Sequence, residues 1–103
     1  FASWCAPCRI EAPIIDELSK ILPVIGIAYK DKYQDTKKFL DNFGNPYIET
    51  GIDKSGKIAI EWGVYGVPET FFIDPQGKIR FKQIGGVSAE LMQEQVDEML
   101  GQG

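Results

Sequence analysis

Two cysteines constrain this chain more than any other feature, because they are its only cysteines and lie three residues apart, at Cys5 and Cys8. At that spacing both sulfurs can lie in the first turn of a helix, where they can form a disulfide and release it again. A helix N-terminus carries a partial positive charge and unpaired N–H groups, which stabilise a thiolate on the first cysteine. Pro7 suits the first turn because its missing N–H costs no hydrogen bond there. The segment therefore predicts a redox-active dithiol at the start of a helix.

Length and composition predict one domain with a single hydrophobic core. The chain has 103 residues, of which 44% are apolar. Its formal net charge is −4 and it has no run of Lys or Arg, which argues against nucleic acid as a partner. Two cysteines are too few for a disulfide-stapled scaffold, and a chain without histidine lacks the usual four ligands of a zinc site. We expect no metal and no cofactor beyond the disulfide, with a static disulfide or a metal shared with a second chain as alternatives.

Hydrophobic periodicity predicts a helix directly after the dithiol and then a strand. Apolar residues recur at helical spacing as far as Leu22, with Pro13 expected to kink the helix and Glu11 placed on its polar face. The unbroken apolar run 24–29 predicts a strand covered on both faces, as in a parallel sheet. The side chains of the helix that are expected to face the core are Ile10, Ile14, Leu18 and Ile21.

The second half of the chain predicts a β-hairpin followed by a helix. Residues 70–74 and 78–84 flank Pro75-Gln76-Gly77, whose proline and glycine set a turn. Ser88 is expected to cap the final helix. The remaining expected elements are helices at 36–43 and 58–62 and a short strand at 47–52. The aromatic residues interpreted as core are Trp62, Phe71 and Phe72.

The order of motifs along the chain resembles the thioredoxin superfamily, and within it the membrane-tethered TlpA-like branch. The resemblance is closest to the thiol:disulfide interchange proteins of cytochrome c maturation, the CcmG/DsbE group, and it covers nearly the whole chain. The segments that carry it are Phe1 to Pro13, Tyr29-Lys30-Asp31, Gly44-Asn45-Pro46-Tyr47 and Gly63 to Phe71. The pair Lys30-Asp31 matches the group, but its chemistry does not follow from the sequence.

The resemblance implies a thioredoxin-like α/β fold, a central mixed sheet flanked by helices. In that fold the strand leading into Cys5 lies between the strand at 24–29 and the hairpin strand that begins at Thr70. Only Phe1-Ala2 could be the end of such a strand. We therefore expect residues 1–103 to be one incomplete domain whose N-terminal strands are missing or truncated. We also expect the sheet to fall into two pieces and the isolated chain to be unstable as a monomer.

The positions of the two cysteines predict their roles in thiol–disulfide exchange. Cys5 is expected to be the exposed nucleophile that attacks a partner disulfide, and Cys8 the buried thiol that resolves the mixed disulfide. Ala6 and Pro7 lie between them and are expected to tune the helix terminus, and hence the stability of the thiolate. Trp4 is expected to pack beside Cys5 and shield the disulfide, or else to be part of the core.

The segment around Pro68 is the second predicted part of the site. The resemblance implies a cis Val67–Pro68 bond beside the cysteines, which leaves the Val67 backbone free to pair with an extended substrate. An ordinary trans turn proline is the alternative. Tyr65 is expected to line the same groove or to serve only in packing.

Two glutamates are the predicted tuning residues. Glu11 follows Cys8 by one helical turn, and Glu69 follows the proline that is expected to face the dithiol. A carboxylate near a thiolate raises the pKa of the thiol, so we expect a milder and more reducing couple than a strong oxidant has. Glu11 is also the only visible candidate for assisting proton transfer to Cys8. Solvated surface glutamates are the alternative for both.

We therefore predict an enzyme, a thiol:disulfide oxidoreductase that reduces disulfides in cytochrome c maturation. The resemblance implies a protein disulfide substrate, such as an apocytochrome c or its assembly chaperone, and a membrane thiol-reducing electron donor. It also implies a periplasmic location and an N-terminal membrane anchor. The apolar run 21–29 is itself too short to span a bilayer. The alternatives are a general TlpA-like extracytoplasmic reductase with other partners and a non-enzymatic thioredoxin-fold binding module.

Overall fold

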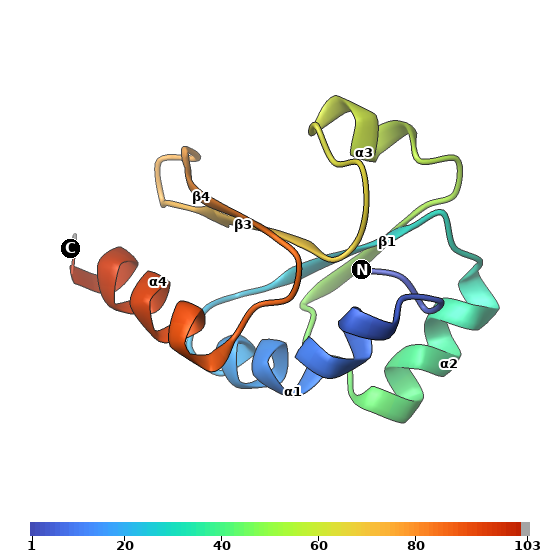
Figure 1. The fold of residues 1–103 in the computed structure, drawn as a ribbon, viewed down its shortest axis with the longest axis horizontal. Helices are drawn as coiled ribbons and strands as arrows, with labels where there is room; N and C mark the ends of the chain where they lie inside the picture. The colour runs from blue at the N-terminus through green and yellow to red at the C-terminus, as the bar shows by residue number, and fades with distance from the viewer. Residues whose placement is uncertain (102–103) are drawn as a thin grey trace.

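Helices and strands alternate along the chain, as a computed structural model of the protein shows for residues 1–101 (Figure 1). The element order is α1 (Ala6–Ser19), β1 (Ile25–Tyr29), α2 (Tyr33–Phe43), β2 (Glu49–Asp53), α3 (Lys57–Glu61), β3 (Glu69–Ile73), β4 (Ile79–Ile84) and α4 (Ala89–Gly101). In the view of Figure 1, α1, α2 and α4 lie on one side of the strands and α3 lies on the other. The arrangement is the α/β architecture that the sequence pattern predicts.

The strands form two separate pairs within the described residues. β1 and β2 are parallel, in register from Ile25 opposite Glu49, and β3 and β4 are antiparallel, with Phe72 opposite Phe81. Phe1 bonds to the free edge of β1, because its amino group donates to Ile27 O at 3.0 Å and its carbonyl accepts from Tyr29 N at 2.7 Å. The expectation of a sheet in two pieces is therefore confirmed for residues 1–101.

Two hydrophobic clusters hold these elements together. The larger cluster joins α1, β3 and α4, and its buried members are Ile15, Leu18, Phe72, Val87 and Val96. The smaller cluster contains both cysteines, and its buried members are Ala2, Cys5, Cys8 and Phe39, with Val67 packed against them. The dithiol is thus part of a packed core that includes α2 and the segment before β3.

The buried face of α1 differs from the predicted one. Cys8, Glu11, Ile15 and Leu18 are buried, whereas Ile10 is 79% exposed, and Ile21, beyond the end of the helix, is also exposed. The predictions that Ile10 and Ile21 face the core and that Glu11 faces solvent are wrong. The physical reason is that the packing of the disulfide fixes the rotation of the helix, so the buried stripe runs from Cys8 at intervals of three and four residues.

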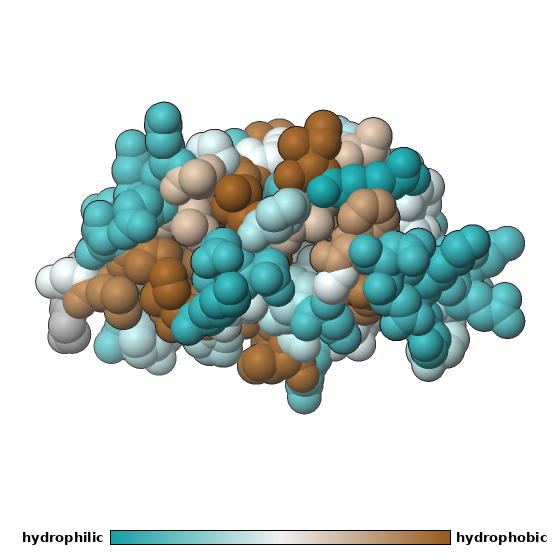
Figure 2. Space-filling model, turned by 90° about the horizontal axis from the view of Figure 1, so that it is seen from below, coloured by the Kyte–Doolittle hydropathy of each residue, from teal (hydrophilic) through white to brown (hydrophobic). Residues whose placement is uncertain are grey.

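Other surface positions also differ from the sequence expectation. β1 is buried on one face only, because Ile25 and Ile27 are exposed while Ala28 is fully buried. Trp62 is half exposed and packs edge-on against Phe71, with ring centroids 5.1 Å apart, so only Phe72 of the three predicted core aromatics is fully buried. Figure 2 shows a mainly hydrophilic face with apolar side chains reaching the surface near the C-terminal end.

Local signals in the second half of the chain are confirmed. The hairpin turn is fixed by Asp74, whose Oδ1 accepts from Gln76 N at 3.0 Å and Lys78 N at 2.9 Å, and by Gly77 at φ 83°. Ser88 Oγ caps α4 by accepting from Leu91 N at 3.1 Å. In the first half of the chain, α2 begins at Tyr33, three residues before the expected start, and its first turn is closed by Thr36 N, which donates to Lys32 O at 2.9 Å.

Candidate active site

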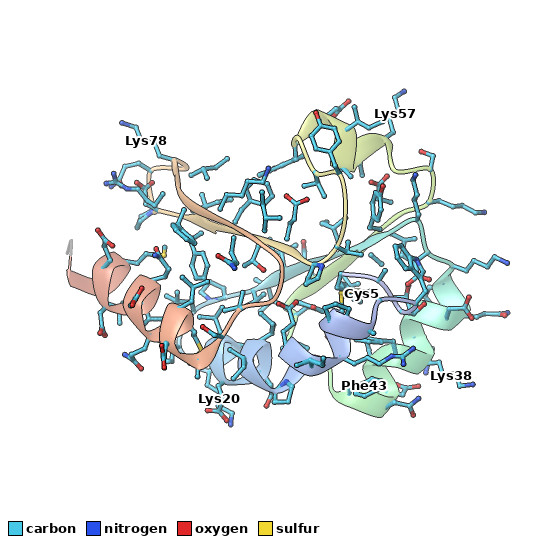
Figure 3. The ribbon with its side chains drawn as sticks, in the orientation of Figure 1. Cys5, Lys20, Lys38, Phe43, Lys57 and Lys78 are labelled. Atoms are coloured by element: carbon cyan, nitrogen blue, oxygen red, sulfur yellow. A yellow bond between two sulfur atoms is a disulfide. The ribbon has the colours of Figure 1, made fainter. Side chains whose placement is uncertain are left out.

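The two cysteines form a disulfide at the start of α1, which Figure 3 shows beside the labelled Cys5. Cys5 is the N-cap residue, with extended backbone at φ −97° and ψ 112°, and its Sγ accepts a hydrogen bond from Cys8 N at 3.2 Å. Pro7 lies in the first turn, where no N–H is needed. A reduced Cys5 sulfur at this place faces a backbone N–H and the positive end of the helix, and both lower the pKa of a thiol.

Both cysteines are buried, although Cys5 was predicted to be exposed. Cys5 is 4% exposed and Cys8 is 2% exposed, so the prediction of an exposed Cys5 is wrong for this disulfide form. The physical reason is that the smaller core cluster closes around the disulfide from Ala2, Phe39 and Val67. The chain neighbours of Cys5 nevertheless lie at the surface, since Trp4, Ala6 and Pro7 are all exposed.

The Val67–Pro68 peptide bond is cis, as the resemblance implies. Pro68 is buried, and its carbonyl accepts from Gly85 N at 2.9 Å, which joins this segment to the end of β4. Val67 packs against the cluster that contains Cys5. Val67 makes none of the backbone hydrogen bonds found outside the helices and strands of residues 1–101. Neither its N–H nor its C=O therefore has a hydrogen-bond partner within these residues.

Glu11 is buried beside the dithiol instead of lying on the polar surface. It is 6% exposed, and its Oε1 accepts from Val87 N at 3.0 Å. Burial raises the pKa of Glu11, and the Val87 hydrogen bond opposes that rise. Glu11, Cys8 and Tyr47 line a cavity of about 10 Å³, which is about the room that one water needs. The alternative of a solvated surface glutamate is wrong for this residue.

Glu69 is held in a network that fixes the segment before Pro68. Its side chain is nearly buried, its Oε2 accepts from Tyr65 N at 3.2 Å, and Lys82 Nζ lies 3.2 Å from its Oε1 as an ion pair. Lys82 Nζ also donates to Gly63 O at 3.1 Å. The alternative of a solvated glutamate is therefore wrong here too, and the Glu69–Lys82 pair holds both ends of the segment 63–65.

Comparison with known protein families matches residues 1–100 to Redoxin. The chain belongs to the Redoxin family. This Redoxin chain is 48% identical over 87 residues to the thiol:disulfide interchange protein CycY of Rhizobium leguminosarum bv. viciae, a match over 82% of the chain and 47% of CycY. It is 43% identical over 90 residues to the DsbE homolog of Paracoccus denitrificans, over 87% of the chain and 50% of that protein. The chain thus spans about half the length of these curated relatives.

The fold of the Redoxin chain is also seen in solved structures. The thioredoxin domain of the thiol-disulfide oxidoreductase BVU-2223 from Bacteroides vulgatus matches with a TM-score of 0.80 at 21% identity, over 96% of this chain and 74% of that domain. At that identity the match shows the fold alone. The prediction of a thioredoxin-like α/β fold is therefore confirmed.

Trp4 and Tyr65, the two predicted aromatic residues of the Redoxin site, lie at its surface. Trp4 is 55% exposed, and its Nε1 donates to Lys30 O at 3.2 Å while its ring lies 6.2 Å from that of Tyr29. Tyr65 is 87% exposed and lines an open cavity of about 460 Å³ together with Val67, Pro68, Glu69 and Lys82. The shielding role of Trp4 and the role of Tyr65 in a groove shared with the dithiol both stay predictions.

Sequence reasoning missed Lys82, although a signal for it was present. In an antiparallel pair, Lys82 lies opposite Phe71, and Glu69 lies on the same face two residues away, so the predicted hairpin could have paired them.

Within residues 1–101, no group of three or more His, Cys, Asp or Glu side chains is placed to hold a metal ion. Across the same residues, the longest apolar helix falls short of what is needed to cross a membrane.

Proposed function

We propose that this protein is a thiol:disulfide oxidoreductase that reduces protein disulfides in cytochrome c maturation. The observation that carries the proposal is the position of Cys5, whose sulfur caps α1 and bonds to Cys8 within a core cluster that the Val67 side chain completes. The names of the relatives support it, since CycY and the DsbE homolog are thiol:disulfide interchange proteins. The disulfide itself is the redox group, and we propose no further cofactor.

The exchange proceeds in two steps from the reduced protein. The Cys5 thiolate attacks one sulfur of a substrate disulfide, so that a mixed disulfide forms and the other substrate sulfur leaves as a thiolate. The Cys8 thiolate then attacks Cys5 Sγ, which releases the second substrate thiol and restores the Cys5–Cys8 disulfide seen in the structure. Two electrons have passed to the substrate, and a dithiol donor must return two electrons to the protein for the next cycle.

The substrate is proposed to bind as an extended segment along Val67. The free N–H and C=O of this residue can add a strand by backbone hydrogen bonds, which depend little on the side chains of the partner. The adjoining cavity, lined by Tyr65 and Pro68, offers room for substrate side chains next to that strand. A segment that contains paired cysteines, as in an apocytochrome c or its assembly chaperone, fits these requirements.

Glu11 and Glu69 are proposed to tune the dithiol toward reduction. A negative charge near a thiolate raises the pKa of the thiol and opposes the effect of the helix N-terminus. A less stable thiolate makes the reduced protein a better electron donor. Glu11 is also proposed to exchange a proton with Cys8 during resolution, since both residues border one small cavity.

The location and the electron donor are proposed from the resemblance to the CcmG/DsbE group. We propose that the protein acts on the periplasmic side of the inner membrane, anchored there in its full-length form. A membrane thiol-reducing protein is the proposed donor. No nucleic acid partner is proposed.

Trapping of the mixed disulfide tests the function. In the full-length natural protein, Cys8→Ser removes the thiol that resolves the mixed disulfide. Substrates therefore remain attached to Cys5 Sγ and are identified by mass spectrometry. We expect cytochrome c assembly components, and we expect none in the matched control Cys5→Ser/Cys8→Ser. Recovery of only unrelated envelope proteins would favour a general reductase, and the absence of any mixed disulfide would favour a binding module.

A further inference from the structure

Cys5 is the last residue of a tight turn that leads into α1. Cys5 N donates to Ala2 O at 3.2 Å, so that residues 2–5 form a turn with Ser3 and Trp4 at its centre; we call residues 2–5 the redox turn. Both central residues are tied to the segment that follows β1. Trp4 Nε1 donates to Lys30 O at 3.2 Å, and Ser3 bonds to Asp31. Two neighbouring residues, Lys30 and Asp31, thus bind the redox turn through hydrogen bonds.

Asp31 is the centre of this attachment. It is 4% exposed and accepts four hydrogen bonds on its two oxygens. Oδ2 accepts from Ser3 N at 2.8 Å and Thr36 Oγ1 at 3.0 Å, and Oδ1 accepts from Ser3 Oγ at 2.7 Å and Lys32 N at 3.0 Å. Burial alone would raise the pKa of Asp31, but the four hydrogen bonds outweigh it and hold that pKa below its usual value. A buried carboxylate with all four donors in place connects the redox turn rigidly to the start of α2.

We propose that Asp31 is a positioning residue for Cys5, which holds the redox turn so that the reduced sulfur stays at the N-terminus of α1. The inference rests on the proposed function, because it concerns the reduced state of the same dithiol. In the oxidised protein the Cys5–Cys8 bond fixes Cys5 covalently. When that bond opens, the backbone of the redox turn still holds Cys5 Sγ near Cys8 N, the contact that stabilises the thiolate. Asp31 therefore stabilises the reduced form more than the oxidised form.

A nearby negative charge and a positioning residue have opposite effects on the Cys5 thiol. If Asp31 acted only through its charge, its removal would lower the pKa of Cys5, because like charges oppose ionisation. If it positions the redox turn, its removal raises that pKa, because the thiolate loses its place at the helix terminus. The sign of the change therefore separates the two roles.

Asp31→Ala and Asp31→Asn in the full-length natural protein supply the test. Asp31→Ala removes all four bonds, and we expect alkylation of Cys5 at neutral pH to slow about tenfold and the equilibrium with glutathione to shift about tenfold toward the disulfide. Asp31→Asn removes the charge, but its oxygen can still accept from Ser3 N and its amide can donate to Ser3 Oγ. We expect this conservative variant to recover the alkylation rate to within about threefold of wild type.

Asp53→Ala is the matched control for a purely structural effect. Asp53 is equally buried and accepts from Ile58 N at 3.2 Å and Ala59 N at 2.9 Å, but its side chain bonds to α3 and not to the redox turn. We expect lower stability in Asp53→Ala and an unchanged pKa of Cys5. A similar result in Asp31→Ala, or a lower Cys5 pKa in both Asp31 variants, overturns the proposal.

Ser3→Ala keeps the test decisive if Asp31→Ala does not fold. This substitution removes only the 2.7 Å bond from Ser3 Oγ and leaves every charge in place. We expect alkylation of Cys5 to slow about two- to threefold, and an unchanged rate in this variant overturns the proposal. Failure of the wider function is distinguishable, because the trapping experiment with Cys8→Ser does not depend on Asp31.

Discussion

Replacing Glu11 with glutamine removes a buried charge beside the dithiol and keeps the shape of the side chain. Glu11 lies one helical turn after Cys8 and accepts a hydrogen bond from Val87 N at 3.0 Å. Because burial raises the pKa of Glu11, the residue ionises at a higher pH than an exposed glutamate does. Above that pH its negative charge opposes ionisation of the neighbouring thiols, and the glutamine variant lacks this effect.

The size of the effect follows from the helix geometry. Side chains at positions i and i+3 of a helix lie about 5–6 Å apart. Two unit charges about 6 Å apart interact by roughly 3 kcal/mol at an effective dielectric constant of about 20, which corresponds to about two pKa units. Screening by solvent reduces this value, so we expect Glu11→Gln to lower the pKa of the Cys8 thiol by about one unit. A smaller decrease is expected at Cys5.

Titration of the reduced protein checks the prediction. The ultraviolet absorbance of the thiolates gives the two apparent pKa values of the coupled pair, and alkylation with mass spectrometry assigns each step to a cysteine. The electrostatic effect of residue 11 on the thiols should vanish at low pH, because the side chain is then neutral in both wild type and Glu11→Gln. Glu17→Gln is the matched control, since Glu17 is exposed on the same helix and pairs with Lys20 at 3.1 Å. Equal apparent thiol pKa values in Glu11→Gln and wild type would refute the reasoning.

The raised pKa of Glu11 also fixes the pH dependence of stability. The folded protein binds the Glu11 proton more tightly than the unfolded chain does, so the resulting stabilisation is full below the unfolded pKa. It is lost as the pH rises through the raised folded pKa. Wild type should therefore lose free energy of unfolding relative to Glu11→Gln across that range, as measured by chemical denaturation at each pH. A gain of wild type relative to the variant would contradict the assignment.

Two further predictions concern the hairpin and the divided sheet. Lys82→Met leaves the nearly buried Glu69 carboxylate without its ion pair, so we expect the free energy of unfolding to fall by about 1–3 kcal/mol. Lys78→Met, at the exposed hairpin turn where Figure 3 shows Lys78 extending outward, should change it by less than about 0.5 kcal/mol, and equal effects of the two would count against the network. A monomer of residues 1–103 alone should unfold without a cooperative transition, because its two strand pairs share no ladder hydrogen bonds that would couple them. A single sharp transition seen by both circular dichroism and fluorescence would disprove this.

The features that the sequence predicted correctly depend on neighbouring residues. The hairpin turn follows from Asp74 and Gly77, and the start of α4 follows from Ser88, whose partners lie within four residues of it. The dithiol at a helix N-terminus is local in the same sense, since Cys8 N bonds to Cys5 Sγ. Because such contacts join residues that are close in the sequence, the types of the neighbouring residues predict them.

The errors concern residues whose partners lie far away in the chain. Hydrophobic periodicity places Glu11 on the solvent face of α1, opposite the apolar residues. Its partner is Val87, 76 residues away, and no periodicity within α1 could indicate it. Asp31 likewise bonds to Ser3, 28 residues away, and its chemistry was invisible in the sequence for that reason. Tertiary hydrogen bonds, and not local propensity, decided both positions.

Three buried carboxylates hold the segments that surround the dithiol, and each accepts a hydrogen bond from a backbone N–H of a different segment. Asp31 binds Ser3 N in the redox turn, Glu69 binds Tyr65 N before the cis proline, and Glu11 binds Val87 N before α4. Glu11, which borders the same small cavity as Cys8, adds a negative charge that opposes the thiolate, whereas Asp31 is proposed to favour the thiolate by holding Cys5 at the helix terminus. The site therefore combines one carboxylate that destabilises the reduced, ionised form with another that stabilises it, so Glu11→Gln and Asp31→Ala should shift the thiol–disulfide equilibrium in opposite directions.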